Sequence, residues 1–325
     1  MAEQVIDTFT TQQLAAEGPQ VHLTRLAQAY VAEGSYFIAD LVAPPIQSAV
    51  NYSYLSYESK WHGKKADNRR ASGTNSNELI WNASKQTGST VPYYAHMKID
   101  DRDAGIFGMA ALENVNTRML AVHMKIQREV RVATIIEATA SYASSSHYTT
   151  LTGTDQWSDY TGSDPEGVIK TAKLQVLNAC GVAANTMSMP ANVAQKLSGH
   201  PAVRDVKKFN AKYDALQIDD LLEGLPPRLW GLRVVVSHAT YNSANPGQTQ
   251  ANAAIWGKHC FIGYVNPNPS PLDQSWMYQF ENLPLTIKKG RSEYLGHSTI
   301  IEAGEDVDEK VVASAAGYIA KSVIA

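Results

Sequence analysis

Residues 109–140, MAALENVNTRMLAVHMKIQREVRVATIIEATA, contain neither glycine nor proline, and they predict one uninterrupted helix. At about 1.5 Å of rise per residue that helix is roughly 45 Å long, whereas a typical helix has about 11–12 residues. Its apolar residues recur at steps of three or four, which places them on one stripe. The stripe consists of Leu112, Val115, Met119, Val122, Ile126, Val130, Ala133 and Ile136. We expect it to pack on strands from the C-terminal part of the chain, in a flat subunit that the helix spans.

A polar segment precedes this helix. Residues 57–90, YESKWHGKKADNRRASGTNSNELIWNASKQTGST, carry few aliphatic side chains and two isolated tryptophans, Trp61 and Trp81. A segment of this length with so little to bury is unusual inside a compact domain. It is therefore either disordered or an extended hairpin whose tryptophans are buried against something else.

The same segment contains a basic cluster, which consists of Lys60, His62, Lys64, Lys65, Arg69 and Arg70. As a nucleic-acid patch the cluster would supply affinity for phosphates, but the formal net charge of the chain is −3, which opposes such binding. As a projecting hairpin it would present its charges to acidic groups of a neighbouring subunit, with Trp61 and Trp81 as anchors. As a solvated loop it would need no partner, and the segment taken alone slightly favours this third interpretation.

The rest of the chain predicts an α+β protein with its helices in the middle. Ser163-Asp164-Pro165-Glu166 combines a capping box with an early proline and opens a second helix, which Gly181 closes. Strands are predicted at residues 186–189 and 233–239, a third helix at 190–197, and strands again from residue 277 onward. Residues 253–256 and 259–265 predict two strands joined by a tight turn. Residues 1–50 predict an arm with a helical piece at 23–32.

The sequence contains no recognisable catalytic or cofactor motif. It lacks GxGxxG, a Walker-type loop, a GxSxG elbow and HExxH. Cys180 and Cys260 form neither a disulfide framework nor a metal cage. His200 and His259 are conceivable catalytic bases, but isolated histidines are far more often surface or hydrogen-bonded residues.

The acidic and apolar patterns of the sequence argue against a calcium site, a signal peptide and a membrane span. Asp100, Asp101 and Asp103 lack the register and the closing glutamate of a calcium loop, so they are interpreted as charges at a helix entry. The first ten residues have no basic region followed by an apolar run, so they predict no signal peptide. No apolar run approaches 18 residues, which predicts no membrane span.

Several stretches, taken in order, resemble one known family. YFIADLVAPPI (36–46) is similar to the stretch that joins an arm to an extended loop, and residues 57–95 are similar to that loop. Residues 105–140 resemble a spine helix, and 185–205, 220–242 and 253–270 follow in the order of an axial domain. DEKVVASAAGYIAKSVIA (308–325) resembles the closing strands. The family is the major capsid proteins of tailed double-stranded DNA bacteriophages, with the Hong Kong 97-like fold.

The resemblance implies a division of the chain into four parts. Residues 1–50 form the N-terminal arm and 51–98 the extended loop, a β-hairpin. Residues 99–162 and 276–305 form the peripheral domain with spine helix 105–140, and 163–275 and 306–325 form the axial domain. The basic segment then lies across a neighbouring subunit. The implied intersubunit contacts are Trp61, Lys64, Lys65, Arg69, Arg70 and Trp81.

The function implied is that of a structural protein without enzymatic activity, metal or cofactor. Its copies would assemble as hexamers and pentamers into an icosahedral shell that encloses double-stranded DNA without binding it specifically. The implied partners are a portal, a separate scaffolding protein and a decoration protein, with no membrane. The shell would be assembled in the cytoplasm of the host bacterium and end as the virion capsid. In some family members a loop lysine is cross-linked to a neighbour, and Lys60, Lys64, Lys65 and Lys85 lie in that region.

Two alternatives stay open. An encapsulin-like protein nanocompartment would share this architecture and enclose a cargo enzyme instead of a genome. An α+β enzyme without a recognisable motif would form only a small oligomer.

Overall fold

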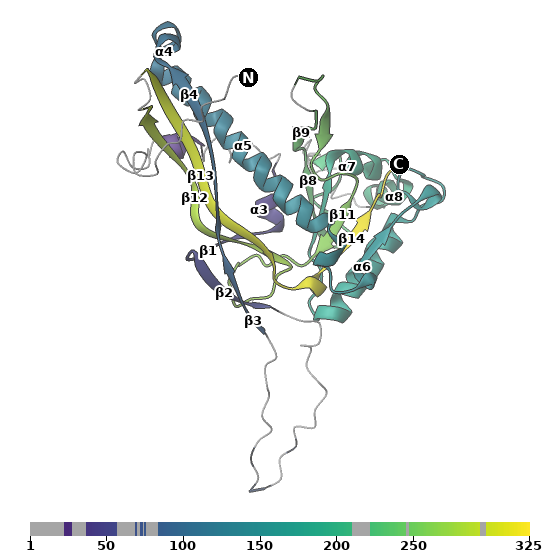
Figure 1. Ribbon diagram of the computed structural model, residues 1–325. Helices are drawn as coiled ribbons and strands as arrows, with labels where there is room; N and C mark the ends of the chain where they lie inside the picture. The colour runs from purple at the N-terminus through teal and green to yellow at the C-terminus, as the bar shows by residue number, and fades with distance from the viewer. Residues whose placement is uncertain are drawn as a thin grey trace.

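The computed structural model describes residues 23–27, 37–56, 69, 72–73, 75, 84–209, 222–244, 247–292 and 297–325. The described chain forms two lobes, which Figure 1 shows side by side with helix α5 running from the far end of the first lobe to the second. A short two-stranded hairpin base lies below the first lobe.

The first lobe is a long sheet with one helix across it. The sheet has the order β1-β12-β13-β4, and its strands are β1 (Pro45–Gln47), β12 (Met277–Arg291), β13 (Ser298–Val311) and β4 (Val91–Asp100). All neighbours are antiparallel except β1 and β12. Helices α4 (Asp101–Phe107) and α5 (Met109–Glu137) follow β4, and α3 (Ala39–Val42) contacts α5.

The second lobe contains a six-stranded sheet of order β5-β14-β11-β6-β8-β7. Its strands are β5 (Tyr148–Thr150), β14 (Gly317–Lys321), β11 (Cys260–Gly263), β6 (Thr186–Pro190), β8 (Leu232–Ser237) and β7 (Arg228–Leu229). Helices α6 (Pro165–Cys180), α7 (Ala191–Ser198) and α8 (Pro201–Phe209) surround it, and β9 (Thr240–Asn242) pairs with β10 (Asn252–Ala254) in a separate ribbon. Short 3₁₀ turns lie at Thr139–Ser141, Ser145–His147, Gly153–Asp155 and Ser314–Ala316.

The predicted long helix is confirmed as α5, although it begins at Met109 instead of residue 105 and ends at Glu137 instead of residue 140. Gly108 has a φ of 85°, a left-handed conformation that glycine adopts without steric cost, and it separates α4 from α5. The 29 residues of α5 correspond to about 43 Å at the usual helical rise. The N-terminal cap lies at the start of α4, the helix before α5. There the Asp100 carboxylate accepts a hydrogen bond from the Arg102 backbone N–H at 2.8 Å.

The predicted core stripe of this helix is correct only in its C-terminal half. Ala133 and Ile136 are buried, whereas Val115 and Met119 are exposed. From its start up to Glu129, the buried face of the helix instead consists of Glu113, Thr117, Leu120, Ala121, Met124, Arg128 and Glu129. A pattern of apolar residues misses this face because three of its members are ionisable. Glu113 and Arg128 are buried in ion pairs, and Glu129 is buried among neutral N–H donors.

The predicted bounds of α6 are confirmed, but its N-cap is Asp164, and the capping box predicted from Ser163 and Glu166 is not formed, because Ser163 donates to the Asp159 carbonyl and Glu166 pairs with Lys170. The Asp164 carboxylate accepts from the Gly167 N–H at 2.9 Å, and Gly181 ends the helix with a φ of 68°. Residues 253–256 and 259–265 do not form a hairpin, because β10 pairs with β9 while β11 pairs with β14 and β6.

Candidate assembly interface

The base of a hairpin is fixed to the first lobe by Tyr52. Strands β2 (Asn51–Ser56) and β3 (Ser84–Ser89) pair antiparallel, with Tyr52 opposite Gly88. The Tyr52 ring stacks on Phe280 with centroids 4.1 Å apart, and its hydroxyl donates to Asp308 at 2.7 Å. A Cβ at Gly88 would lie 2.5 Å from this ring, so the glycine leaves the space that the ring fills. The strand ends that lead into residues 57–83 are thus held in a fixed place.

Most of the predicted contact residues lie between these strand ends. Trp61, Lys64, Lys65, Arg70 and Trp81 lie outside the described residues. Arg69 is described and exposed. Their role as intersubunit contacts stays a prediction.

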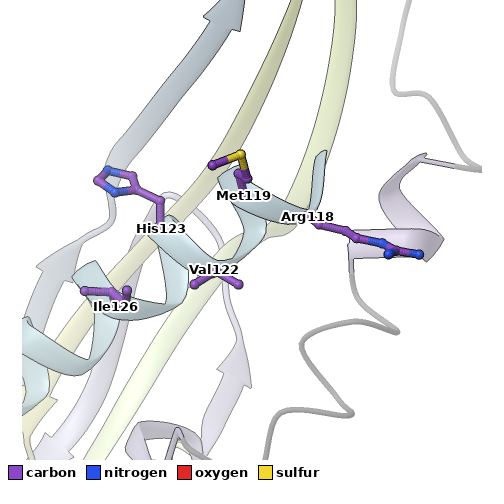
Figure 2. A pocket seen from close by; sticks show the side chains of 5 residues that line it. All are labelled: Arg118, Met119, Val122, His123 and Ile126. Atoms are coloured by element: carbon purple, nitrogen blue, oxygen red, sulfur yellow. The ribbon is translucent and has the colours of Figure 1, made fainter. Parts of the chain in front are cut away.

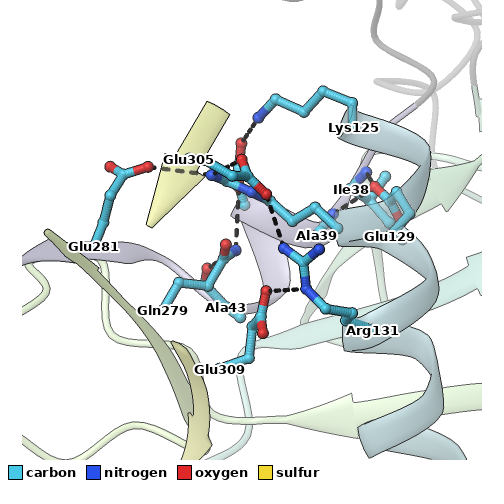
Figure 3. A network of polar contacts seen from close by, with 12 residues as sticks. Ile38, Ala39, Ala43, Lys125, Glu129, Arg131, Gln279, Glu281, Glu305 and Glu309 are labelled. Atoms are coloured by element: carbon cyan, nitrogen blue, oxygen red, sulfur yellow. Dashed lines mark hydrogen bonds and ion pairs between the residues drawn. The ribbon is translucent and has the colours of Figure 1, made fainter. Parts of the chain in front are cut away.

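A network of charged side chains joins the N-terminal segment, α5 and the sheet (Figure 3). Arg128 donates to Asp40 at 3.1 Å, to Glu281 at 3.1 Å and to Glu305 at 2.6 Å. Arg131 adds bonds to Glu305 and to Glu309, Lys125 pairs with Asp40, and Gln279 donates to Asp40 and to the Ala43 carbonyl. Burial alone would raise the pKa of Asp40, but Lys125 and Arg128 outweigh it and lower the pKa to about 2. The sequence does not reveal this network, because its members lie up to 269 positions apart along the chain and come together only in the folded structure.

Glu129 joins three parts of the chain. Its carboxylate accepts from the backbone N–H groups of Ile38 and Ala39 and, at 2.6 Å, from the Trp256 indole N–H. Ile38 and Ala39 lie at the start of α3, whereas Trp256 lies in the turn between β10 and β11, a strand of the second lobe. Burial raises the pKa of Glu129 to about 7, although the three donors act in the opposite direction.

The outward side of α5 is apolar over its N-terminal half. Met119, Val122 and Ile126, together with Arg118 and His123, line a shallow hollow of about 390 Å³. Figure 2 shows these five side chains along the helix, with Arg118 directed to the side opposite His123. The sequence signal for this exposed apolar surface is the step of three or four between its residues. The same step is typical of a helix face that packs into a core, so the sequence alone does not distinguish the two.

The two histidines singled out as possible bases have structural partners. His200 Nδ1 accepts from the Ala202 N–H at 3.2 Å, so its Nε2–H faces the Ser163 hydroxyl oxygen, 3.2 Å away. Ser163 in turn donates to the Asp159 carbonyl, and this chain of donors leaves no nitrogen to deprotonate the serine. His259 Nδ1 accepts from the Ser322 N–H, and its Nε2 lies 3.7 Å from Glu137. Both histidines thus join segments of the second lobe.

The described part of the chain offers neither a metal centre nor a membrane-spanning helix. There, no group of three or more His, Cys, Asp or Glu side chains is placed to hold a metal ion. No helix in the same ranges combines the length and the apolar character that crossing a lipid bilayer requires.

Comparisons with known proteins identify the fold. No protein-family description and no curated protein matches the chain. Among solved structures, a phage-related protein from Bordetella bronchiseptica is 21% identical with a TM-score of 0.70, over 94% of this chain and 97% of that one. The capsid of the cyanophage P-SCSP1u gives a TM-score of 0.55 at 11% identity, over 99% and 91% of the two chains. A virus-like particle from Pyrococcus furiosus gives 0.51 at 10% identity, over 93% and 98%.

These matches extend over nearly the whole chain, so they concern its architecture and not a shared fragment. The chain has the mixed helix-and-strand fold of phage capsid proteins, which confirms the resemblance at the level of the fold.

Proposed function

We propose that the chain is the major capsid subunit of a tailed double-stranded DNA bacteriophage. The observation that supports this most is the likeness to the phage-related protein, at a TM-score of 0.70 over 94% of the chain. The subunit would form hexamers and pentamers of an icosahedral shell that encloses the genome and ends as the virion capsid. It would act as a structural protein and not as an enzyme.

The division of the chain proposed here follows the Hong Kong 97-like plan. The peripheral domain (99–162 and 276–305) would lie mainly in the first lobe, with α5 as its spine, and the axial domain (163–275 and 306–325) mainly in the second. The sheet of the first lobe also takes in β1 and β4, which belong largely to the arm and the loop of this division. Residues 1–50 would be the arm and 51–98 the extended loop, whose base β2 and β3 form. Assembly inside the host, a portal, a scaffolding protein and a decoration protein belong to the same proposal.

Charge supports a container that does not hold its contents specifically. The net charge of −3 gives little electrostatic attraction to DNA. Many weak contacts between copies would instead add up, because a closed symmetric shell repeats each of them. Within one subunit a surface ion pair is worth only about 0–1 kcal/mol.

Electron microscopy of the purified chain tests this function directly. We expect closed particles of uniform diameter, alone or after co-expression with a scaffolding protein. A protein that elutes as a small oligomer in both cases, with no particles in micrographs, would overturn the proposal and leave the enzyme alternative.

The contents of the particles separate the phage capsid from the second candidate. The second candidate is a protein nanocompartment. The likeness to the virus-like particle from Pyrococcus furiosus, at a TM-score of 0.51, is the observation that favours it. Nuclease-protected double-stranded DNA in particles from infected cells supports the capsid, whereas one co-purifying cargo enzyme supports the nanocompartment.

The proposed contact residues have their own test. Reversing Lys64, Lys65, Arg69 and Arg70 to Glu should slow assembly and make it more sensitive to salt, while the unfolding midpoint of the subunit stays within error. The matched control keeps the charges but exchanges the residue types (K64R, K65R, R69K, R70K) and should assemble at close to the normal rate. Normal assembly of the reversed variant would reduce the cluster to a solvated loop.

A further inference from the structure

The N-terminal half of α5 has two faces of opposite character. Val115 and Met119 are 51% and 57% exposed, and Val122 and Ile126 are half-buried. At about 100° per residue, this stripe lies nearly opposite the buried face formed by Leu120, Ala121 and Met124. Apolar surface gathered on one side of a helix is typical of a contact that another segment completes.

The N-terminal part of the chain enters the described structure beside this half of α5. Leu23 and Ala27 are buried in the same cluster as Leu120 and Met124. The Thr24 hydroxyl accepts from the Ile287 N–H at 3.0 Å, which fixes the segment against β12. The 22 residues before Leu23 therefore start next to α5. At up to about 3.3 Å per residue, a handful of them suffices to pass around a helix roughly 10–12 Å across.

The chemistry of these 22 residues complements the exposed stripe. MAEQVIDTFTTQQLAAEGPQVH contains large apolar side chains at Val5, Ile6, Phe9 and Leu14. It contains three carboxylates, at Glu3, Asp7 and Glu17, and neither lysine nor arginine. The hollow on α5 is apolar and is flanked by the basic side chains Arg118 and His123.

From this position, length and charge, we propose that the outward face of α5 around Met119 is the docking site for residues 1–22 of the same chain. The segment covers Val115, Met119 and Val122 with its apolar side chains and sets its carboxylates toward Arg118 and His123. This contact shields the apolar outward face of α5 from water in each subunit. It stands independently of the shell function, because it concerns a single copy.

Thiol labelling of a cysteine on the stripe tests the docking. The two native cysteines, Cys180 and Cys260, are buried, so they contribute little background. Met119→Cys is labelled with a maleimide in the full chain and in a chain that lacks residues 2–22, using the fraction that elutes as a single subunit. We expect about tenfold slower labelling in the full chain, since the rate follows the undocked fraction. Val115→Cys serves as a second position if the first variant folds poorly.

Two comparisons make the result specific. Leu272→Cys, which is 63% exposed at a turn before β12, should be labelled at the same rate in both chains. Replacing Glu3, Asp7 and Glu17 by their amides should restore a large part of the fast labelling at position 119.

Each remaining outcome overturns the docking of the chain on itself. Equal rates at position 119 with and without residues 2–22 show that the segment does not cover α5. Protection that increases with protein concentration assigns the face to a second copy. Particle formation is scored separately by microscopy, so failure of the shell function and failure of this inference are distinguishable.

Discussion

At the scale of single residues, Glu129 links the N-terminal segment to both lobes with a carboxylate whose charge depends on pH near neutrality. Burial raises its pKa from the ordinary value of 4.5 to about 7. Between these values the folded state keeps a proton that the unfolded state releases, so this group stabilises the fold at low pH and the contribution is lost as pH rises through 7.

Glu129→Gln should remove this pH dependence. We expect the stability of the wild-type subunit, relative to the variant, to fall from pH 5 to pH 8 in urea titrations at each pH. The lost bond to the Trp256 indole adds an offset that does not vary with pH. A difference between the two proteins that stays constant over this range would show that Glu129 is ionised throughout.

A second residue-scale prediction concerns the hairpin base. Gly88→Ala would place a Cβ 2.5 Å from the Tyr52 ring and push that ring from its stack on Phe280, which should cost about 1–3 kcal/mol. Gly105→Ala is the matched control, because nothing lies within 4 Å of that site in α4, and it should be neutral or stabilising by up to about 1 kcal/mol. Urea unfolding midpoints measure both, and equal midpoints would contradict the packing argument.

At the scale of elements, α5 shows where sequence patterns succeed and fail. Its length follows from the absence of glycine and proline after Gly108, and the caps of α6 are local, so both helices could be predicted. The inward face of α5 could not, because Arg128 and Glu129 become buried only through partners such as Asp40, Glu305 and Trp256. Strand partners are equally non-local, which is why residues 253–265 were expected to form a hairpin and do not.

The two faces of α5 should respond differently to the same substitution. Leu120→Asp places a carboxylate among Ala121, Met124 and Ile301 without a partner, a strongly unfavourable change, and should give insoluble protein. Val122→Asp, two residues along on the outward side, should keep the subunit folded with a cost within about 1 kcal/mol. Solubility and circular dichroism after expression compare them. Insolubility of both variants would show that the outward face is also part of the core.

The ion network offers another contrast within α5. Arg128→Met leaves Asp40, Glu281 and Glu305 without a cation that pairs with all three. Removing one partner of a buried charge network costs about 3–5 kcal/mol. Lys170→Met breaks an exposed pair with Glu166 and should cost no more than about 0.5 kcal/mol. Similar unfolding midpoints for the two variants would mean that the network adds nothing to stability.

At the scale of the whole molecule, folding and assembly should depend on different parts of the chain. Ser56 pairs directly with Ser84, so residues 57–83 can be replaced by Asn-Gly, the pair that favours a two-residue hairpin turn. We expect an unchanged unfolding midpoint and no closed particles. The control replaces the same residues with a glycine–serine segment of equal length, which separates loss of contacts from loss of length. Particles of normal size from the Asn-Gly variant would show that this segment has no part in assembly.

The position of the last strands has a consequence for how the protein is made. In one sheet β14 lies between β5 and β11, and in the other β12 and β13 lie between β1 and β4. Each sheet thus receives interior strands from the region after residue 276, which the ribosome synthesises after the other described strands of the two sheets. Neither lobe can close while that region is still untranslated, although domains in general begin to fold from the N-terminal side during synthesis. In the proposed shell, a growing chain would therefore present no finished lobe to neighbouring subunits before the region after residue 276 has been made.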